Sequence, residues 1–217
     1  MFDALFTTTT EYKKLSHALS GKGACALFGL PASGRAQVYA ALCRQLDKPL
    51  CIVTPGEAEA TRFAADLNTL GIPAAVFPAR DYVLRPIEGT AREYEYRRLA
   101  VLGELVGGRL RAVAVPAEAL TQFTTPKEDF CANTRTLHAG DTLLRDDLLA
   151  ALFGAGYTRR AQVDGPGQFS VRGDIVDIFA PDQKMPVRME FWGDEIDTLH
   201  TFDLTTQRRE DAIDKFY

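Results

Sequence analysis

Residues 156–208 read GYTRRAQVDGPGQFSVRGDIVDIFAPDQKMPVRMEFWGDEIDTLHTFDLTTQR, and this stretch decides the fold of the second half of the chain. Apolar and polar residues alternate in Val187–Trp192, which is typical of a strand with one buried face. Gly193-Asp194 fits a tight turn to the next strand. Three further segments have strand character, so the stretch predicts a small antiparallel meander of four strands: Gln168–Arg172, 174–179, Val187–Trp192 and Glu195–Phe202.

Toward the N-terminus the pattern changes at Thr124-Thr125-Pro126. Between this point and the meander, the spacing of leucines predicts one helix at 145–153. Before it, short apolar runs alternate with helical periodicities. Continuous apolar strands that alternate with helices predict a parallel sheet covered on both faces. The expected strands are 24–28, 50–53, 74–77 and 112–115, and the expected helices are 35–46, 57–70 and 92–106.

The domain organisation follows from these patterns. Residues 1–125 are expected to form an α/β domain, and residues 126–208 a smaller α+β domain with an antiparallel sheet. The charged residues 209–217 are expected to be a linker or the truncated start of a next element, as in a fragment of a longer chain.

The charge and the cysteines limit the class of protein. The 217 residues have a formal net charge of -4, and 46% of them are hydrophobic, which is typical of a globular protein. Proteins that bind DNA usually carry a basic surplus, because phosphate neutralisation drives their affinity. The four cysteines lack metal-ligand spacing, and Cys25 and Cys51 fall in apolar runs. We expect buried thiols in a cytoplasmic protein, with no signal peptide and no membrane span.

A glycine-rich segment follows the first expected strand. Gly29 and Gly34 have the spacing of a phosphate-binding P-loop, which lies between a buried strand and a helix. A working P-loop continues with Lys, which reaches the phosphates, and Ser or Thr, which holds Mg²⁺. Here these positions are Arg35 and Ala36. The first domain is therefore expected to be a degenerate RecA-like (P-loop NTPase-like) lobe that does not bind ATP, although weak anion binding stays open.

The remaining polar residues favour binding over catalysis. Strand alternation places Ser170 and Arg172 away from the core, and Gly173 is expected to mark a bulge or a close backbone approach. Arg159, Arg160 and Arg172 form either a solvated face or a partner surface, because arginine is enriched at interfaces. The three histidines share no spacing with acids or cysteines. We therefore expect no catalytic residue, metal or cofactor.

The linked motifs of the second half resemble the domain shared by the excision repair protein UvrB and the transcription-repair coupling factor. The matching segments are Gly-x-Phe-x-Val-Arg-Gly-Asp at 167–174, Asp177-Ile178-Phe179, Arg-x-Glu-Phe at 188–191, Gly193-Asp194-Glu195-Ile196 and Phe202-Asp203. The degenerate P-loop favours the coupling factor, because UvrB keeps its lysine and threonine. Residues 77–86 also leave no room for the DNA-gripping hairpin of UvrB.

The resemblance implies a docking role. It predicts that the second domain binds UvrA, the damage-sensing ATPase, in transcription-coupled nucleotide excision repair. Arg159 and Arg172 fall on arginines that UvrB uses for this contact, while Ser170 stands where UvrB has a third. The expected UvrA-binding set comprises Arg159, Arg160, Ser170, Arg172 and Asp174.

The resemblance also implies partners for other regions of a full-length coupling factor. These are RNA polymerase, DNA and an intramolecular C-terminal domain, with no membrane. Two alternatives stay open at this point. The chain could be a nucleotide-dependent helicase or translocase fragment of the UvrB type, or it could bind DNA directly.

Overall fold

The computed structural model describes residues 7–21, 24–46, 48–80 and 92–217. The chain divides into two compact units, Met1–Phe123 and Thr124–Tyr217. The division falls two residues before the boundary expected from the sequence. The expectation that residues 77–86 lack a hairpin lies largely outside the described residues.

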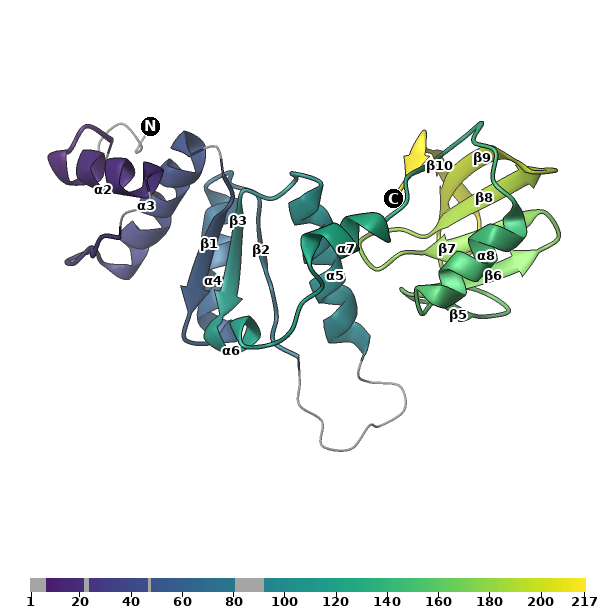
Figure 1. Cartoon of the computed structure of the whole chain (residues 1–217), viewed down its shortest axis with the longest axis horizontal. Helices are drawn as coiled ribbons and strands as arrows, with labels where there is room; N and C mark the ends of the chain where they lie inside the picture. Colours follow the sequence, from purple (N-terminus) through teal and green to yellow (C-terminus); the bar gives the residue numbers. More distant parts are fainter. Residues whose placement is uncertain (1–6, 22–23, 47, 81–91) are drawn as a thin grey trace. The chain divides into compact units, whose positions relative to one another are not determined.

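The first unit is built on parallel strands, as the alternation of apolar runs and helices predicts (Figure 1). Among the described residues, β1 (Leu50–Thr54), β3 (Ala112–Pro116) and β2 (Ala74–Val76) lie in this order, and β3 pairs in parallel with both neighbours. One face packs against α3 (Ala32–Gln45) and α4 (Glu57–Thr69), and the other against α5 (Arg92–Val106). The other helices among the described residues of this unit are α2 (Thr10–Ser20) and α6 (Ala117–Leu120).

The strand expected at 24–28 is absent from the described sheet. These residues have no regular secondary structure and are exposed, and Phe28 has an exposed fraction of 88%. The apolar composition of these residues was not sufficient to predict a strand, because a strand also needs a neighbouring strand with which to pair. The expectation of buried thiols fails with it, since Cys25, Cys51 and Cys131 are exposed and only Cys43 is buried.

The second unit contains a six-stranded sheet of order β10-β9-β8-β7-β6-β5 (Figure 1). β5 pairs in parallel with β6, and the other neighbours are antiparallel. The four predicted strands are present, although β7 starts one residue later than expected. The strands of this sheet are β5 (Thr158–Arg159), β6 (Gln168–Arg172), β7 (Ile175–Phe179), β8 (Val187–Trp192), β9 (Glu195–Phe202) and β10 (Arg209–Ala212). Two further helices are α7 (Lys127–Ala132) and α8 (Arg145–Gly154).

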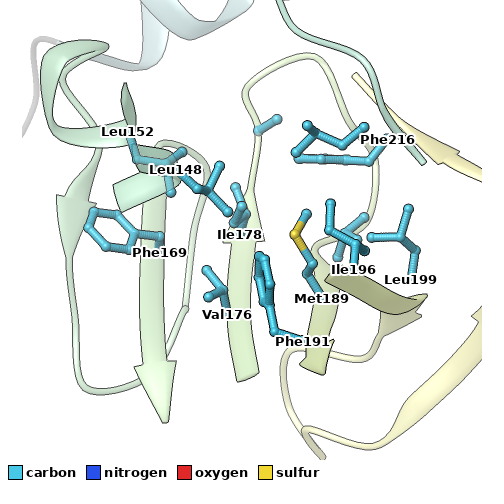
Figure 2. Packing of buried hydrophobic residues seen from close by; sticks show 13 residues of the cluster. Leu148, Leu152, Phe169, Val176, Ile178, Met189, Phe191, Ile196, Leu199 and Phe216 are labelled. Carbon is cyan, nitrogen blue, oxygen red and sulfur yellow. The ribbon is translucent and has the colours of Figure 1, made fainter. Parts of the chain in front are cut away.

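One face of this sheet forms the main core of the unit, which we call the core face. Leu148 and Leu152 of α8 pack on Phe169 and Ile178, as Figure 2 shows. The central strands supply Val176, Met189 and other apolar residues of alternating positions to the same cluster. The alternation read from the sequence therefore assigns this face correctly.

The C-terminal residues belong to the second unit, so the expectation of a linker or of the truncated start of a next element at 209–217 is wrong. β10 pairs with β9, and β11 (Lys215–Phe216) pairs with β4 (Leu137–His138). Phe216 is buried in the main core (Figure 2). The charged composition concealed this role, because the exposed edge strand β10 carries only one apolar residue, Ala212.

The expectation for Gly173 also needs correction. Arg172 pairs with Ile175, so Gly173 and Asp174 form a two-residue hairpin loop. Gly173 has φ +60°, and an added Cβ would meet no atom within 4 Å. The glycine is therefore favoured by its left-handed backbone, and neither a bulge nor a close approach is involved. The turn predicted at Gly193 is confirmed, with φ +64°.

Candidate protein-docking site

The second face of the six-stranded sheet, opposite the core face, carries a row of polar residues on adjacent strands. Ser170 of β6 pairs with Asp177 of β7, and Asp177 pairs with Arg188 of β8. Paired residues project to the same face of a sheet, so these three side chains meet. Val163 and Leu204, from loops outside the sheet, pack near Phe202 against the same face. The row is therefore enclosed by a second, smaller apolar cluster.

Asp177 is the centre of this row. Its side chain is buried, and its carboxylate accepts hydrogen bonds from Arg188 Nε at 2.7 Å and Arg188 Nη2 at 3.0 Å. Arg188 is also buried and lies over the ring of Phe202, with its Cζ 4.7 Å from the centroid. A forked arginine–carboxylate pair satisfies two buried charges with a fixed geometry. The row therefore has a rigid centre.

Arg172 joins the same carboxylate from the end of β6. Its Nη2 donates to Asp177 Oδ2 at 2.6 Å, while 46% of its side chain stays exposed. Ser170 Oγ lies 3.4 Å from the same oxygen and is buried. The expected orientation away from the main core is correct for both residues. The implied exposure of Ser170 is wrong, because the second face is covered at this position.

Asp174 lies in the hairpin loop beside Arg172. Its side chain is 77% exposed, and it pairs with Arg145 Nη1 at 3.1 Å. The same Nη1 donates to the carbonyl of Gly173 at 2.9 Å. Arg145 begins α8, so this contact joins the hairpin to the helix that covers the core face.

Arg159 and Arg160 lie at the edge strand β5 and just after it. Arg159 pairs in parallel with Phe169, so the two side chains project to the core face. Arg172, three residues beyond Phe169, lies on the second face. Arg159 and Arg160 are exposed, and no described residue makes an ion pair with either side chain. The structure therefore does not bring Arg159 and Arg172 together on one face.

Asp177 and Arg188 were missed as members of the site by sequence reasoning. Each interrupts an apolar strand, Ile-Val-Asp-Ile-Phe and Val-Arg-Met-Glu-Phe-Trp. Alternation along Val187–Trp192 placed Arg188 opposite the buried face of its strand, whereas Asp177 was recognised only as part of the motif Asp177-Ile178-Phe179. Their opposite charges at inner positions of consecutive strands were the signal available, because a buried charge requires a partner.

The glycine-rich segment of the first unit differs from a P-loop in its backbone. α3 already begins at Ala32, and the N–H groups of Gly34 and Arg35 donate to the carbonyl of Pro31 at 2.9 and 3.2 Å. In a P-loop such N–H groups point at phosphate. Arg35 is exposed and Ala36 is buried, while Gly29 has φ +83°. The segment therefore differs from a working P-loop in its backbone hydrogen bonds as well as in the side chains at positions 35 and 36.

The described residues also contain neither of two features that other functional classes require. No group of three or more His, Cys, Asp or Glu residues there is placed to hold a metal ion. No helix in those segments is long and apolar enough to cross a membrane.

Comparison with known families identifies the class of the second unit. Residues 136–217 match the family model described as "UvrB interaction domain". The matched region includes the whole six-stranded sheet and the row around Asp177. The match confirms the resemblance on which the docking interpretation depends.

Most of the chain, including part of the first unit, is similar to transcription-repair-coupling factors. It is 38% identical over 192 residues to that of Mycobacterium tuberculosis, covering 85% of this chain and 15% of that protein. The identity is 34% over 196 residues for Myxococcus xanthus and 29% over 189 residues for Bacillus subtilis. The chain spans about 16% of the length of these two relatives.

Proposed function

We propose that this chain is a non-catalytic docking module that binds UvrA in transcription-coupled nucleotide excision repair. The observation that carries the proposal is the UvrB interaction domain, in a chain similar to coupling factors over most of its length. In a longer protein of this kind, RNA polymerase, DNA and an internal C-terminal domain would be contacted by other regions. The module would act in the cytoplasm.

The row around Asp177 supports this role because it prepares Arg172 for a partner. Two arginines share one carboxylate, so the row has a surplus of one positive charge. The exposed part of that charge belongs to Arg172. Among the contacts between described residues, only Nη2 of Arg172 is engaged. Its other N–H groups can donate to a carboxylate of UvrA.

Pre-organisation of Arg172 makes the net binding free energy of such a contact more favourable. A free arginine loses side-chain entropy when it binds, typically about 0.5–1.5 kcal/mol. The bond to Asp177 already restricts Arg172, and the ladder of β6 and β7 fixes its backbone. Part of the ordering cost is therefore met when the domain folds.

The other residues of the expected set take different parts in this proposal. Arg159 and Arg160 supply a second cationic area at the edge strand, exposed and without an internal ion pair in the described chain. Ser170 supports Asp177 from inside the sheet. Asp174 orders the hairpin through Arg145 and leaves most of its carboxylate exposed.

The test is the affinity of the 217-residue chain for purified UvrA. Arg172→Glu would place a second carboxylate beside Asp177, so Arg172→Gln and Arg172→Lys are the cleaner changes. Loss of an arginine–carboxylate contact at an interface costs at least about 2 kcal/mol, or roughly thirtyfold in affinity. We expect that loss for Arg172→Gln and a partial loss for Arg172→Lys, which keeps the charge without the planar fork.

Arg135→Gln is the matched control, because Arg135 is exposed in the same unit and outside the polar row. Circular dichroism and the urea midpoint show whether each variant is folded. Wild-type chain that fails to bind UvrA would remove the proposed function. Unchanged affinity of Arg172→Gln would remove Arg172 from the contact.

A further inference from the structure

The second face also carries the most exposed aromatic side chain of the sheet. Trp192 ends β8 and has an exposed fraction of 83%. Met189 and Phe191 of the same strand are buried in the main core. Trp192 therefore projects to the opposite face, together with Arg188 and Glu190. It is the one tryptophan of the chain.

The strand register places Trp192 near Arg172. Arg172 pairs with Ile175, and Ile175 pairs with Glu190. Because strands lie about 4.8 Å apart, the backbones of Arg172 and Glu190 are about 10 Å apart. Trp192 follows two residues later, which adds about 7 Å along the strand. Both side chains thus fit within the footprint of a single partner.

A second arginine reaches the same area from the edge strand β10. Arg209 makes an ion pair with Glu190, the neighbour of Trp192 on this face. Its side chain is about half exposed, whereas that of Glu190 is mostly buried. The same relation holds for Arg172 and Asp177. On this side of Trp192 the arginines therefore face solvent and the carboxylates lie beneath them.

The other side of Trp192 is acidic. Glu195 pairs directly with Trp192, and Asp194 lies in the turn between β8 and β9. Both residues are exposed. Acidic groups next to the ring disfavour the phosphates of a nucleic acid. A protein partner with its own charge pattern fits this arrangement better.

We propose that Trp192 is the apolar anchor of a docking surface formed with Arg172 and Arg209, here called the tryptophan surface. Its occupant is a protein with an apolar pocket that has a carboxylate on the side of the two arginines. Tryptophan and arginine are both enriched among the residues that dominate binding energy at interfaces. The proposal rests on the proposed function in taking UvrA as this partner.

The single tryptophan provides a direct test. Chain labelled with 5-fluorotryptophan gives one fluorine resonance, because unlabelled UvrA contributes none. On saturation with UvrA we expect this resonance to shift and to lose most of its solvent isotope effect, since the ring becomes buried. An unchanged isotope effect in a sample shown by co-purification to be bound would overturn the proposal.

Variants separate this proposal from the proposed function. We expect Trp192→Ala to weaken UvrA binding at least tenfold with an unchanged urea midpoint. Arg209→Gln should weaken binding severalfold and lower the urea midpoint, because the mostly buried Glu190 loses its ion-pair partner. Phe123→Ala is the control, because Phe123 is 95% exposed and lies in the first unit. If Trp192→Ala binds UvrA with full affinity while Arg172→Gln binds it weakly, the role of Trp192 as an anchor is contradicted and the proposed function is not. Absence of wild-type binding contradicts the proposed function itself.

A nucleic-acid partner is the competing explanation for an exposed tryptophan beside arginines. Single-stranded DNA that stacks on the ring would quench its fluorescence, with an affinity that falls steeply as salt rises. We expect no quenching by a 20-mer oligonucleotide at 150 mM salt. Saturable quenching under these conditions would overturn the assignment of a protein partner.

Discussion

Replacing Asp177 with asparagine tests the polar row on which the proposed docking surface depends. The change keeps the size of the side chain but removes the charge that satisfies Arg188. Both residues are buried, and their contacts are 2.7 and 3.0 Å long. Removing one partner of a buried ion pair typically costs about 3–5 kcal/mol, because the other charge stays buried without compensation. We expect a loss of that size in the stability of the second unit.

Hydrogen exchange measured by mass spectrometry is the suitable assay, because it reports each unit separately. The amides of β7 and β8 lie in the centre of the sheet, and their exchange requires the unit to open. A loss of about 3 kcal/mol corresponds to exchange more than roughly a hundredfold faster. Amides of β3, in the first unit, should exchange at the wild-type rate.

Asp174→Asn is the matched control for this experiment. Asp174 also pairs with an arginine, at 3.1 Å, but its side chain is largely exposed. Exposed ion pairs contribute about 0–1 kcal/mol, so exchange should change less than about fivefold. Combining Asp177→Asn with Arg188→Met should restore part of the lost stability, because no buried charge is then left unpaired. Similar effects of Asp177→Asn and Asp174→Asn would refute the reasoning.

Three other predictions concern single residues elsewhere in the chain. Burial raises the pKa of the Cys43 thiol. Iodoacetamide at neutral pH should therefore alkylate exposed Cys131 first and Cys43 only after unfolding. Equal alkylation rates of the two cysteines in peptide mapping would contradict this. Hydrogen bonds from Thr206 lower the pKa of Asp203 in the folded chain. The stabilising effect of Asp203 is therefore present above its pKa in the unfolded chain and is lost as pH falls through its pKa in the folded chain. The urea midpoints of wild type and Asp203→Asn should converge in acid, and a constant difference between them would contradict this prediction. Phe216→Ala should destabilise the second unit by about 3–5 kcal/mol in hydrogen exchange, and a wild-type rate would show that the C-terminal strand is dispensable.

The regular elements were predictable because their patterns are local. Four strands of the meander and the helices α3, α4 and α5 of the first unit follow from period-two and helical spacing of apolar residues, whereas α2 and α6 were not expected. Residues 24–28 show where such reasoning ends. Their composition equals that of a buried strand, but pairing depends on a neighbour that the pattern does not specify.

The candidate site was predictable only in part. The motifs identified the class of domain, and alternation placed Arg172 away from the main core. Alternation could not reveal that loops cover the second face, so Ser170 was expected to be exposed. The roles of Asp177 and Arg188 depend on strand register, which brings together residues 11 positions apart in the sequence.

Competition between this chain and UvrB for UvrA tests the central claim most directly. A UvrB interaction domain that docks UvrA through the same surface should exclude UvrB from the complex. We predict that labelled UvrB is displaced from UvrA as unlabelled chain is added, and that Arg172→Gln chain displaces it only at concentrations roughly thirtyfold higher. A stable ternary complex of the three proteins, or displacement that is equal for both chains, would contradict the account.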